Sequence, residues 1–222
     1  MGDFMDFFDL HCDTLTECMD DGDSLLKNER DIDFERGKIF GRWNQVFAVF
    51  IPDSMDDSLV ESYFDSACDF YLSELKKKGD VFPILSSEDV RGHSRGVMLA
   101  MESSRGVGSL ERLEKLYERG LRLITLTWNH KNRAAGGCDE GGGLTDWGRE
   151  LVSKMEKLGI VTDVSHLSDR SFYDLCEFSD APFIASHSDA RAVHNEVRSL
   201  TDEQIKIIIE RGGLIGLNFY DR

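Results

Sequence analysis

Residues 7–14 have the sequence FFDLHCDT, a short apolar segment that runs directly into two residues of metal-ligating type. Phe7–Leu10 has the composition of a short buried strand. Side chains on a strand alternate between its two faces, so we expect His11 and Asp13 to point the same way. An imidazole and a carboxylate at the end of a strand suit a divalent cation such as zinc. A complete metal site would require further ligands at the ends of later strands.

Similar apolar segments recur along the chain and alternate with amphipathic segments of helical period. The expected strands are residues 7–10, 43–51, 97–101, 121–127, 160–165, 182–186 and 214–220. The expected helices are residues 55–78, 109–119, 145–158, 168–178 and 201–211, with Gly79, Gly120, Gly159 and Gly212 at their ends. This alternation predicts an α/β protein with parallel strands. Seven strand units favour a TIM-like (β/α)8 barrel, and an open doubly wound sheet is the alternative, although no GxGxxG motif follows the first strand.

Composition narrows the choice of partners and compartment. The chain of 222 residues has 42 acidic and 26 basic side chains and a net charge of −16, which disfavours nucleic acid and anionic membranes as partners. The five cysteines are scattered without a CxxC motif, as expected for reduced thiols. No signal peptide or membrane-spanning apolar run is evident. A soluble cytoplasmic protein is therefore expected.

Polar residues of metal-ligating type follow several of the expected strands. They are His11 and Asp13, Glu102, His166 and His187. The carboxyl ends of strands in a parallel barrel meet at one rim, where active sites are built. Five ligands exceed the needs of one catalytic zinc but suit two metals about 3.5–4 Å apart, with Glu102 as the bridge. Any one of these residues is more often a hydrogen-bonding or capping group, but their convergence favours a metal site.

The other histidines and the glycine-rich run carry weaker signals. His93, His130 and His194 lie in polar segments and are expected at the surface. The run at residues 136–143 lacks the GK[ST] ending of a phosphate-binding loop, so we expect a flexible lid there.

The chain resembles the membrane (renal-type) dipeptidases, the M19 metallopeptidases, in their bacterial cytosolic form. The resemblance runs almost end to end, through the blocks DLHCDT, MLAMES, LYERGLRLITLTWNH, GLTDWGRELVSKMEKLGIVTDVSH, IASHSDARAV and GLIGLNFY. It implies a TIM-like barrel with two Zn²⁺ that cleaves dipeptides, tolerates a D-residue at the C-terminal position, and uses a metal-bridging hydroxide. A dipeptide substrate is thus the expected partner, and a homodimer is an open alternative for the assembly.

The resemblance also implies roles for individual residues. Glu102 would bridge the two zinc ions, with His11 and Asp13 at the first and His166 and His187 at the second. Arg198 would hold the carboxylate of the dipeptide through its fork of donors, and Asn129 is a second expected substrate contact.

Three departures from the family pattern qualify these expectations. Ser103 stands where the family usually has glycine, and Trp128 stands where the animal enzymes have a substrate-contacting histidine. Family chains continue well beyond this length, and the proton-transfer Asp is expected beyond residue 222, so no catalytic residue is assigned. Residues 1–222 are thus expected to form a single hydrolase barrel domain without its C-terminal part. The alternatives are another binuclear hydrolase, acting on an amide, lactone or phosphoester, and an inactive metal-binding chain.

Overall fold

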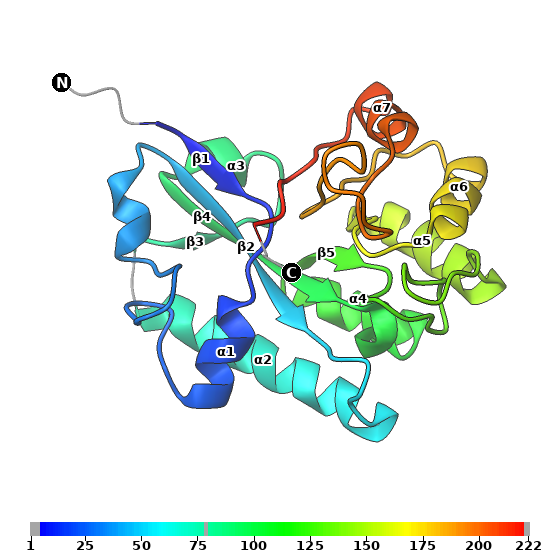
Figure 1. The fold of residues 1–222 in the computed structure, drawn as a ribbon. Coiled ribbons are helices and arrows are strands. Elements are labelled where there is room, and N and C mark those ends of the chain that lie inside the picture. Colours follow the sequence, from blue (N-terminus) through cyan, green and yellow to red (C-terminus); the bar gives the residue numbers. More distant parts are fainter. Residues whose placement is uncertain (1–4, 78–79, 220–222) are drawn as a thin grey trace.

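The computed structural model describes residues 5–77 and 80–219 of the chain (Figure 1). Its strands are β1 (Phe7–Asp9), β2 (Trp43–Phe50), β3 (Phe82–Pro83), β4 (Arg95–Glu102), β5 (Leu121–Thr125) and β6 (Val161–Asp163). Its α-helices are α1 (Thr14–Asp21), α2 (Asp57–Lys77), α3 (Asp89–Gly92), α4 (Leu110–Glu118), α5 (Asp146–Leu158), α6 (Asp169–Phe178) and α7 (Asp202–Glu210). Two 3₁₀ helices, η1 (Arg36–Ile39) and η2 (Ser104–Val107), complete the described elements.

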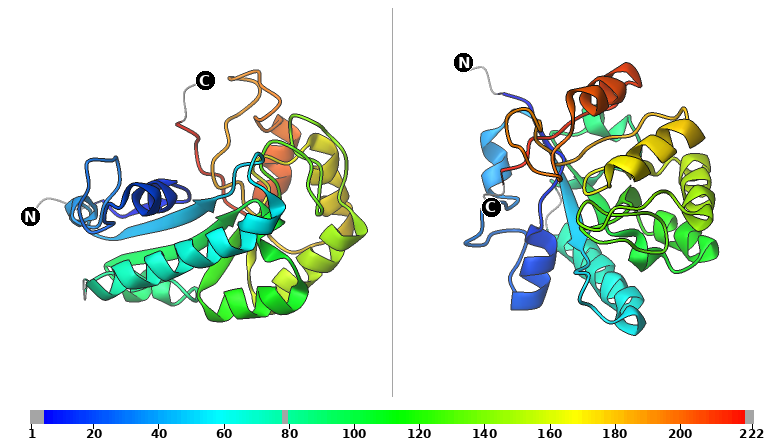
Figure 2. Two further views of the ribbon diagram at one scale, coloured as in Figure 1. Left: turned by 90° about the horizontal axis from the view of Figure 1, so that it is seen from below. Right: turned by 45° about the vertical axis from the view of Figure 1, so that its right-hand side comes forward.

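The strands form one parallel sheet in the order β1-β2-β4-β5-β6, with β3 added beside β4. Single parallel bridges continue this order from Asp163 to Ile184 and from Ala185 to Ile215. The sheet curves, and helices α2, α4, α5 and α6 lie on its outer side (Figure 2). The prediction of an α/β fold with a parallel, partial TIM-type barrel is confirmed.

Alternation along the strands builds two apolar layers. In β2, Phe47 and Val49 face the helices and belong to the main core, whereas Val46 and Ala48 face the inside of the curved sheet. Both faces are covered, which explains why the predicted strands are continuously apolar. The inner layer is completed by small and medium side chains of neighbouring strands, including Ala100, Leu123, Phe8 and Ile184.

The predicted helix boundaries are largely confirmed, and capping residues explain where several of the helices begin and end. The hydroxyl of Thr145 accepts a hydrogen bond from the Gly148 amide at the start of α5, and Gly159 ends that helix with a φ of 79°. Thr201 forms a capping box with Gln204 at the start of α7. The predicted end of the second helix at Gly79 lies outside the described residues.

Other boundaries differ from the predictions. The prediction included no helix α1 and no β3 or α3, because these elements are short or only weakly amphipathic. Residues 182–186 and 214–219 make bridges but no regular strand, and Tyr220 lies outside the described residues. In the first of these segments the amide of Ser186 donates to the Asp163 carboxylate instead of to a strand carbonyl, which interrupts the ladder.

Ser103, directly after β4, occupies a backbone conformation that disfavours a side chain. Its φ is 83°, and its buried hydroxyl has no hydrogen-bond partner among the described residues. We expect Ser103→Gly to raise the free energy of unfolding by about 1 kcal/mol, because relief of strain outweighs the added entropy of glycine in the unfolded chain. Urea denaturation measures this difference. Ser103→Ala keeps the strained Cβ and should recover less, and a lower urea midpoint for Ser103→Gly would contradict the interpretation.

Candidate metal centre

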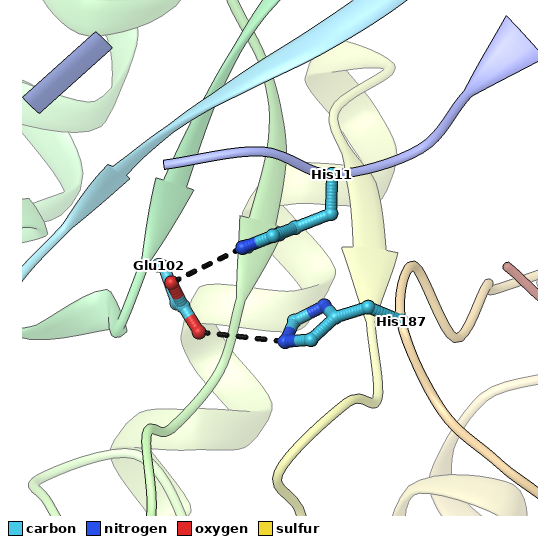
Figure 3. A group of neighbouring side chains, drawn as sticks. All are labelled: His11, Glu102 and His187. Atoms are coloured by element: carbon cyan, nitrogen blue, oxygen red, sulfur yellow. Dashed lines mark ion pairs between the residues drawn. The ribbon is translucent and has the colours of Figure 1, made fainter. Parts of the chain in front are cut away.

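The carboxyl ends of the parallel strands bring the predicted ligands to one rim of the curved sheet. His11 follows β1, Glu102 is the last residue of β4, and His166 follows β6. His187 follows the bridged segment that extends the sheet beyond β6. Ligand atoms of His11, Glu102 and His187 lie within 4.8 Å of one another, a spacing suited to a metal ion (Figure 3). The chain therefore contains a candidate metal site built from these three residues.

Glu102 lies at the centre of the cluster and is only 3% exposed. Its Oε2 is 3.4 Å from Nε2 of His11. Its Oε1 is 3.0 Å from Nε2 of His166 and 3.6 Å from Nε2 of His187. Burial opposes the charged form, but His11, through its charge and its hydrogen bond, holds the pKa of Glu102 well below its usual value. The two carboxylate oxygens thus face different groups of nitrogen atoms.

Asp13 adds a second carboxylate on the side of His11. Its Oδ1 lies 3.4 Å from His11 Nε2, and its side chain is about half exposed at 48%. Asp13 precedes α1, but its side chain makes no capping hydrogen bond. The alternative role of this carboxylate as a helix cap therefore does not apply. Burial by itself would lower the pKa of His11, yet Glu102 and Asp13 together raise it to about 10.

His166 and His187 form a close pair of imidazoles, with their Nε2 atoms 2.9 Å apart. Burial lowers the pKa of His166 to about 3 and that of His187 to about 4, so both rings are neutral near pH 7. His166 also has a left-handed backbone, with a φ of 68°. Such strain in a non-glycine residue concentrates at functional sites, where the surroundings hold it.

The donor set fits a divalent transition metal. Three imidazoles and two carboxylates are the ligand types that zinc takes in proteins. A buried carboxylate beside two neutral Nε2 atoms at contact distance is an arrangement that a cation would stabilise.

Arg198 lies beside the cluster, and its predicted role in binding a substrate carboxylate stays a prediction. Its Nη2 donates to the carbonyl oxygen of His187 at 2.7 Å, and its Nη1 donates to the hydroxyl of Ser188 at 2.9 Å. Within the described part of the chain, no carboxylate lies within ion-pair distance of this guanidinium. Burial, opposed by more distant acidic groups, lowers its pKa. A largely buried cation with two neutral partners is well suited to receive an anion.

Asn129 has a different partner from the substrate contact predicted for it. Its Oδ1 accepts a hydrogen bond from Nδ1 of His166 at 2.8 Å and is 3.5 Å from the thiol of Cys138. Asn129 is buried, with an exposed fraction of 6%. Asn129 therefore orients a histidine of the candidate metal centre, a contact that the sequence argument missed, and its predicted substrate contact stays a prediction.

Asp163, at the end of β6, was also missed. It is fully buried and accepts hydrogen bonds from two amides and two hydroxyls. Burial would raise its pKa, but His187 and these donors hold the pKa of Asp163 below its usual value. The available signal was a carboxylate at the end of an apolar segment, three residues before His166.

The glycine-rich run is a packed loop, which corrects the prediction of a flexible lid. Gly136 and Gly137 are buried, and the Gly136 amide donates to the hydroxyl of Ser171 at 2.9 Å. The Cys138 amide donates to the carbonyl oxygen of His166 at 2.9 Å. The loop thus supports the strained backbone of His166.

The remaining predicted surface histidines are partly confirmed. His194 is exposed, and exposed His130 pairs with Asp53 through Nδ1 at 2.7 Å. His93 is half-buried and stacks on Phe82, with ring centroids 4.1 Å apart.

A separate cleft of about 690 Å³ lies on the rim beside η2 and the start of α2. None of the five predicted metal ligands lines it. Some of its charged side chains pair with one another, as Arg105 does with Asp57 and His130 with Asp53. We therefore place the candidate chemistry at the donor cluster and not in this cleft.

The segment that carries Arg198 is fastened to α6 by Arg191. The Arg191 guanidinium makes two bonds of 2.8 Å to the Asp169 carboxylate and donates to the carbonyl oxygens of Ser199 and Val197. We expect Arg191→Met to lower the free energy of unfolding by about 1 kcal/mol, a modest amount because the pair is partly exposed. Amide hydrogen exchange should increase within residues 192–198.

The same pair predicts a pH dependence. Hydrogen bonds from Arg191 lower the pKa of Asp169, so its stabilisation is present above the unfolded value of about 3.9 and is lost as the pH falls through the folded value. The stabilities of wild type and Arg191→Met should converge in acid. The control is Arg170→Met, which removes a side chain that is 77% exposed. A constant difference between wild type and Arg191→Met at all pH values would contradict the assignment.

A partial parallel barrel with imidazole and carboxylate donors at its carboxyl rim defines a class of barrel proteins with a candidate metal centre. The family model of the membrane dipeptidases, peptidase family M19, matches residues 3–222. The chain therefore belongs to this family, which confirms the resemblance.

Curated relatives match part of this chain. An uncharacterized protein of Klebsiella pneumoniae is 33% identical over 148 residues, covering 61% of this chain and 55% of the relative. One from Acinetobacter calcoaceticus is 32% identical over 142 residues, covering 60% and 45%. An uncharacterized dipeptidase of Schizosaccharomyces pombe is 36% identical over 118 residues, covering 50% and 28%. The matches thus span about half or less of the length of these relatives.

Solved structures share the fold. The chain is similar to dipeptidase AC, a metallopeptidase of family M19, with a TM-score of 0.88 and 26% identity over 97% of this chain and 72% of that one. It also has the fold of a metallopeptidase from Rhodobacter sphaeroides, with a TM-score of 0.85 and 24% identity over 98% and 74% of the chains. That protein was solved with a phosphinate mimic of the dipeptide L-Ala-D-Ala. Among the described residues, no helix combines the length and apolar character that a membrane span requires.

Proposed function

We propose that the protein hydrolyses the peptide bond of dipeptides at a centre of two zinc ions. The observation that carries this proposal is the division of Glu102 between two groups of donors. Oε2 of Glu102 faces Nε2 of His11, which also lies 3.4 Å from Oδ1 of Asp13. Oε1 of Glu102 faces Nε2 of His166 and of His187. Membership of the dipeptidase family supports the same assignment.

The donor spacings support two metals rather than one. The donor-to-donor distances given above run from 2.9 to 3.6 Å. A tetrahedral zinc with bonds of about 2.0–2.1 Å requires its ligand atoms to be about 3.3 Å apart. Glu102 Oε1 and Nε2 of His166 and His187 therefore have nearly the spacing of three ligands of one zinc. On the other side, His11 Nε2 lies at such a distance from Glu102 Oε2 and from Asp13 Oδ1.

Bound zinc would polarise the peptide carbonyl and activate water for attack. The residues of the chain supply the rest of the site. Glu102 and Asp13 provide negative charge, and neutral His166 and His187 provide nitrogen lone pairs. Arg198 holds the substrate carboxylate, because among the described residues its guanidinium has only neutral hydrogen-bond partners.

The position of Arg198 favours short peptides. It contacts the main chain of His187, so a carboxylate bound there lies close to the metal donors. A peptide bond that reaches those donors is then near the C-terminus of the substrate, as in a dipeptide. The fold shared with the Rhodobacter protein, which was solved with a dipeptide mimic, is in keeping with this class.

The test combines metal content with substrate choice. The metal-depleted protein is titrated with zinc by calorimetry, and hydrolysis of L-Ala-L-Ala, L-Ala-D-Ala and their C-terminal amides is followed by amine release. We expect two zinc ions per chain and hydrolysis of the free dipeptides in preference to the amides. Turnover of a lactone or phosphoester with no dipeptide turnover would support another binuclear hydrolase. Zinc binding without any turnover would support an inactive metal-binding chain.

A further inference from the structure

A buried hydrogen-bond chain leads from Asp163 to the metal centre. Asp163 is hydrogen-bonded to Ser186, in the segment that carries His187. Its Oδ1 accepts from the amides of Ser165 and Ser186 at 3.0 and 2.9 Å. Its Oδ2 accepts from the hydroxyls of Thr125 and Ser186 at 2.7 and 2.6 Å. With four donors directed at it, the carboxylate is an acceptor only, which is the ionised form.

Ser186 transmits this arrangement to His187. Its hydroxyl lies 2.6 Å from Asp163 Oδ2 and 2.7 Å from Nδ1 of His187, and it has a single proton to donate. A hydrogen bond to an ionised acceptor is the stronger choice, so the proton goes to Asp163. The Ser186 oxygen must then accept a proton from His187 Nδ1. Nε2 of His187 is left with its lone pair directed at the cluster.

His166 is held in the same tautomer by a neutral partner. Nδ1 of His166 donates to the Asn129 amide oxygen at 2.8 Å, so its Nε2 also keeps a lone pair. Both lone pairs then meet across the 2.9 Å that separates the two Nε2 atoms. A cation beside the two atoms would bind to both lone pairs. The hydrogen-bond chain from Asp163 is therefore expected to change the affinity of the site for a metal.

We infer that Asp163 is a positioning residue of the metal centre, which through Ser186 fixes His187 with its proton on Nδ1 and its Nε2 free to bind metal. The inference rests on the proposed function only in naming zinc as the bound cation. Partners of this kind, behind the ligand, typically change metal affinity 10–100-fold when they are altered.

Asp163→Asn is the decisive variant because it reverses the direction of the hydrogen bonds from Asp163 to His187, while the side chain keeps its shape. The new NH₂ group faces the hydroxyls of Ser186 and Thr125 and donates to them. The Ser186 proton then turns to Nδ1 of His187, which moves the ring proton to Nε2 and blocks that donor. We expect zinc affinity, measured by competition with a chromogenic chelator, to fall about 10–100-fold.

The tautomer is read directly by ¹⁵N NMR of histidine in the metal-free chain. Wild type should show His187 protonated on Nδ1, and Asp163→Asn should show it protonated on Nε2. The matched control is Thr125→Val, which removes one hydrogen bond to Asp163 but leaves the chain through Ser186 intact. This variant should keep both the wild-type tautomer and a zinc affinity within about threefold, since no ligand partner changes.

Several outcomes would overturn the inference. One is a wild-type His187 with its proton on Nε2, and another is an Asp163→Asn variant with unchanged tautomer and zinc affinity. If circular dichroism shows that Asp163→Asn does not fold, Ser186→Ala replaces it, and unchanged zinc affinity there would count equally against the inference. Because the tautomer is measured without metal, a protein that hydrolyses no dipeptide would defeat the proposed function while leaving this result intact.

Discussion

Replacement of Glu102 by glutamine is expected to abolish binding of both zinc ions. The carboxylate is shared, so the substitution removes a ligand from each group of donors and places an NH₂ group near Nε2 of either His11 or His166. The buried cluster also loses its central negative charge. We expect kcat/KM for dipeptides to fall by at least about 10³-fold, which corresponds to about 4 kcal/mol of transition-state stabilisation. Plasma mass spectrometry of the purified variant measures its zinc content.

Glu118→Gln is the matched control for this experiment. It makes the same chemical change at an exposed position at the end of α4, remote from the carboxyl rim. Its zinc content and activity should equal those of wild type. A Glu102→Gln variant that retains two zinc ions would show that Glu102 does not bridge. Loss of only one zinc would assign Glu102 to a single group of donors.

Sequence reasoning predicted that the candidate metal donors lie together, because their signal is local. Each candidate ligand follows an apolar segment, and in a parallel sheet the ends of such segments must meet at one rim. His11 and Glu102 are far apart in the chain, yet the strand pattern alone predicts that they meet. The same reasoning identified the helix caps Thr145 and Thr201, since capping depends on residues only three positions apart.

The residues behind the ligands could not be found in this way. The contact of Asn129 with His166 joins residues 37 positions apart, and that of Ser186 with Asp163 joins residues 23 apart. No spacing rule connects such pairs, because they depend on how two loops pack above the sheet. The left-handed backbone of His166 is equally invisible in the sequence. Only the folded arrangement shows that the glycine-rich run supports His166 instead of covering the site.

Arg198→Met is expected to impair dipeptide binding while leaving the metal centre intact. Within residues 5–77 and 80–219, the hydrogen bonds of the guanidinium go to the His187 carbonyl oxygen and the Ser188 hydroxyl, both neutral acceptors. A substrate carboxylate would supply its missing charge, and such charge-assisted bonds contribute about 1.5–3 kcal/mol each. We expect KM for L-Ala-L-Ala to rise on the order of 10²-fold, with kcat changed much less. Steady-state kinetics on the zinc-loaded protein, with zinc content measured in parallel, tests this.

Two comparisons show whether Arg198 recognises the substrate carboxylate or only supports the loop that carries His187. Dipeptide amides lack the anion, so Arg198→Met should hydrolyse them as well as wild type does and should lose the preference for free dipeptides. Arg198→Lys restores the charge without the planar fork, and it should recover part of the binding. Equal loss of activity toward dipeptides and their amides, together with loss of zinc, would instead mean that Arg198 mainly holds the His187 main chain in place. The two neutral hydrogen-bond partners of Arg198, with no paired carboxylate in the part of the chain that the structure describes, favour recognition of the substrate anion.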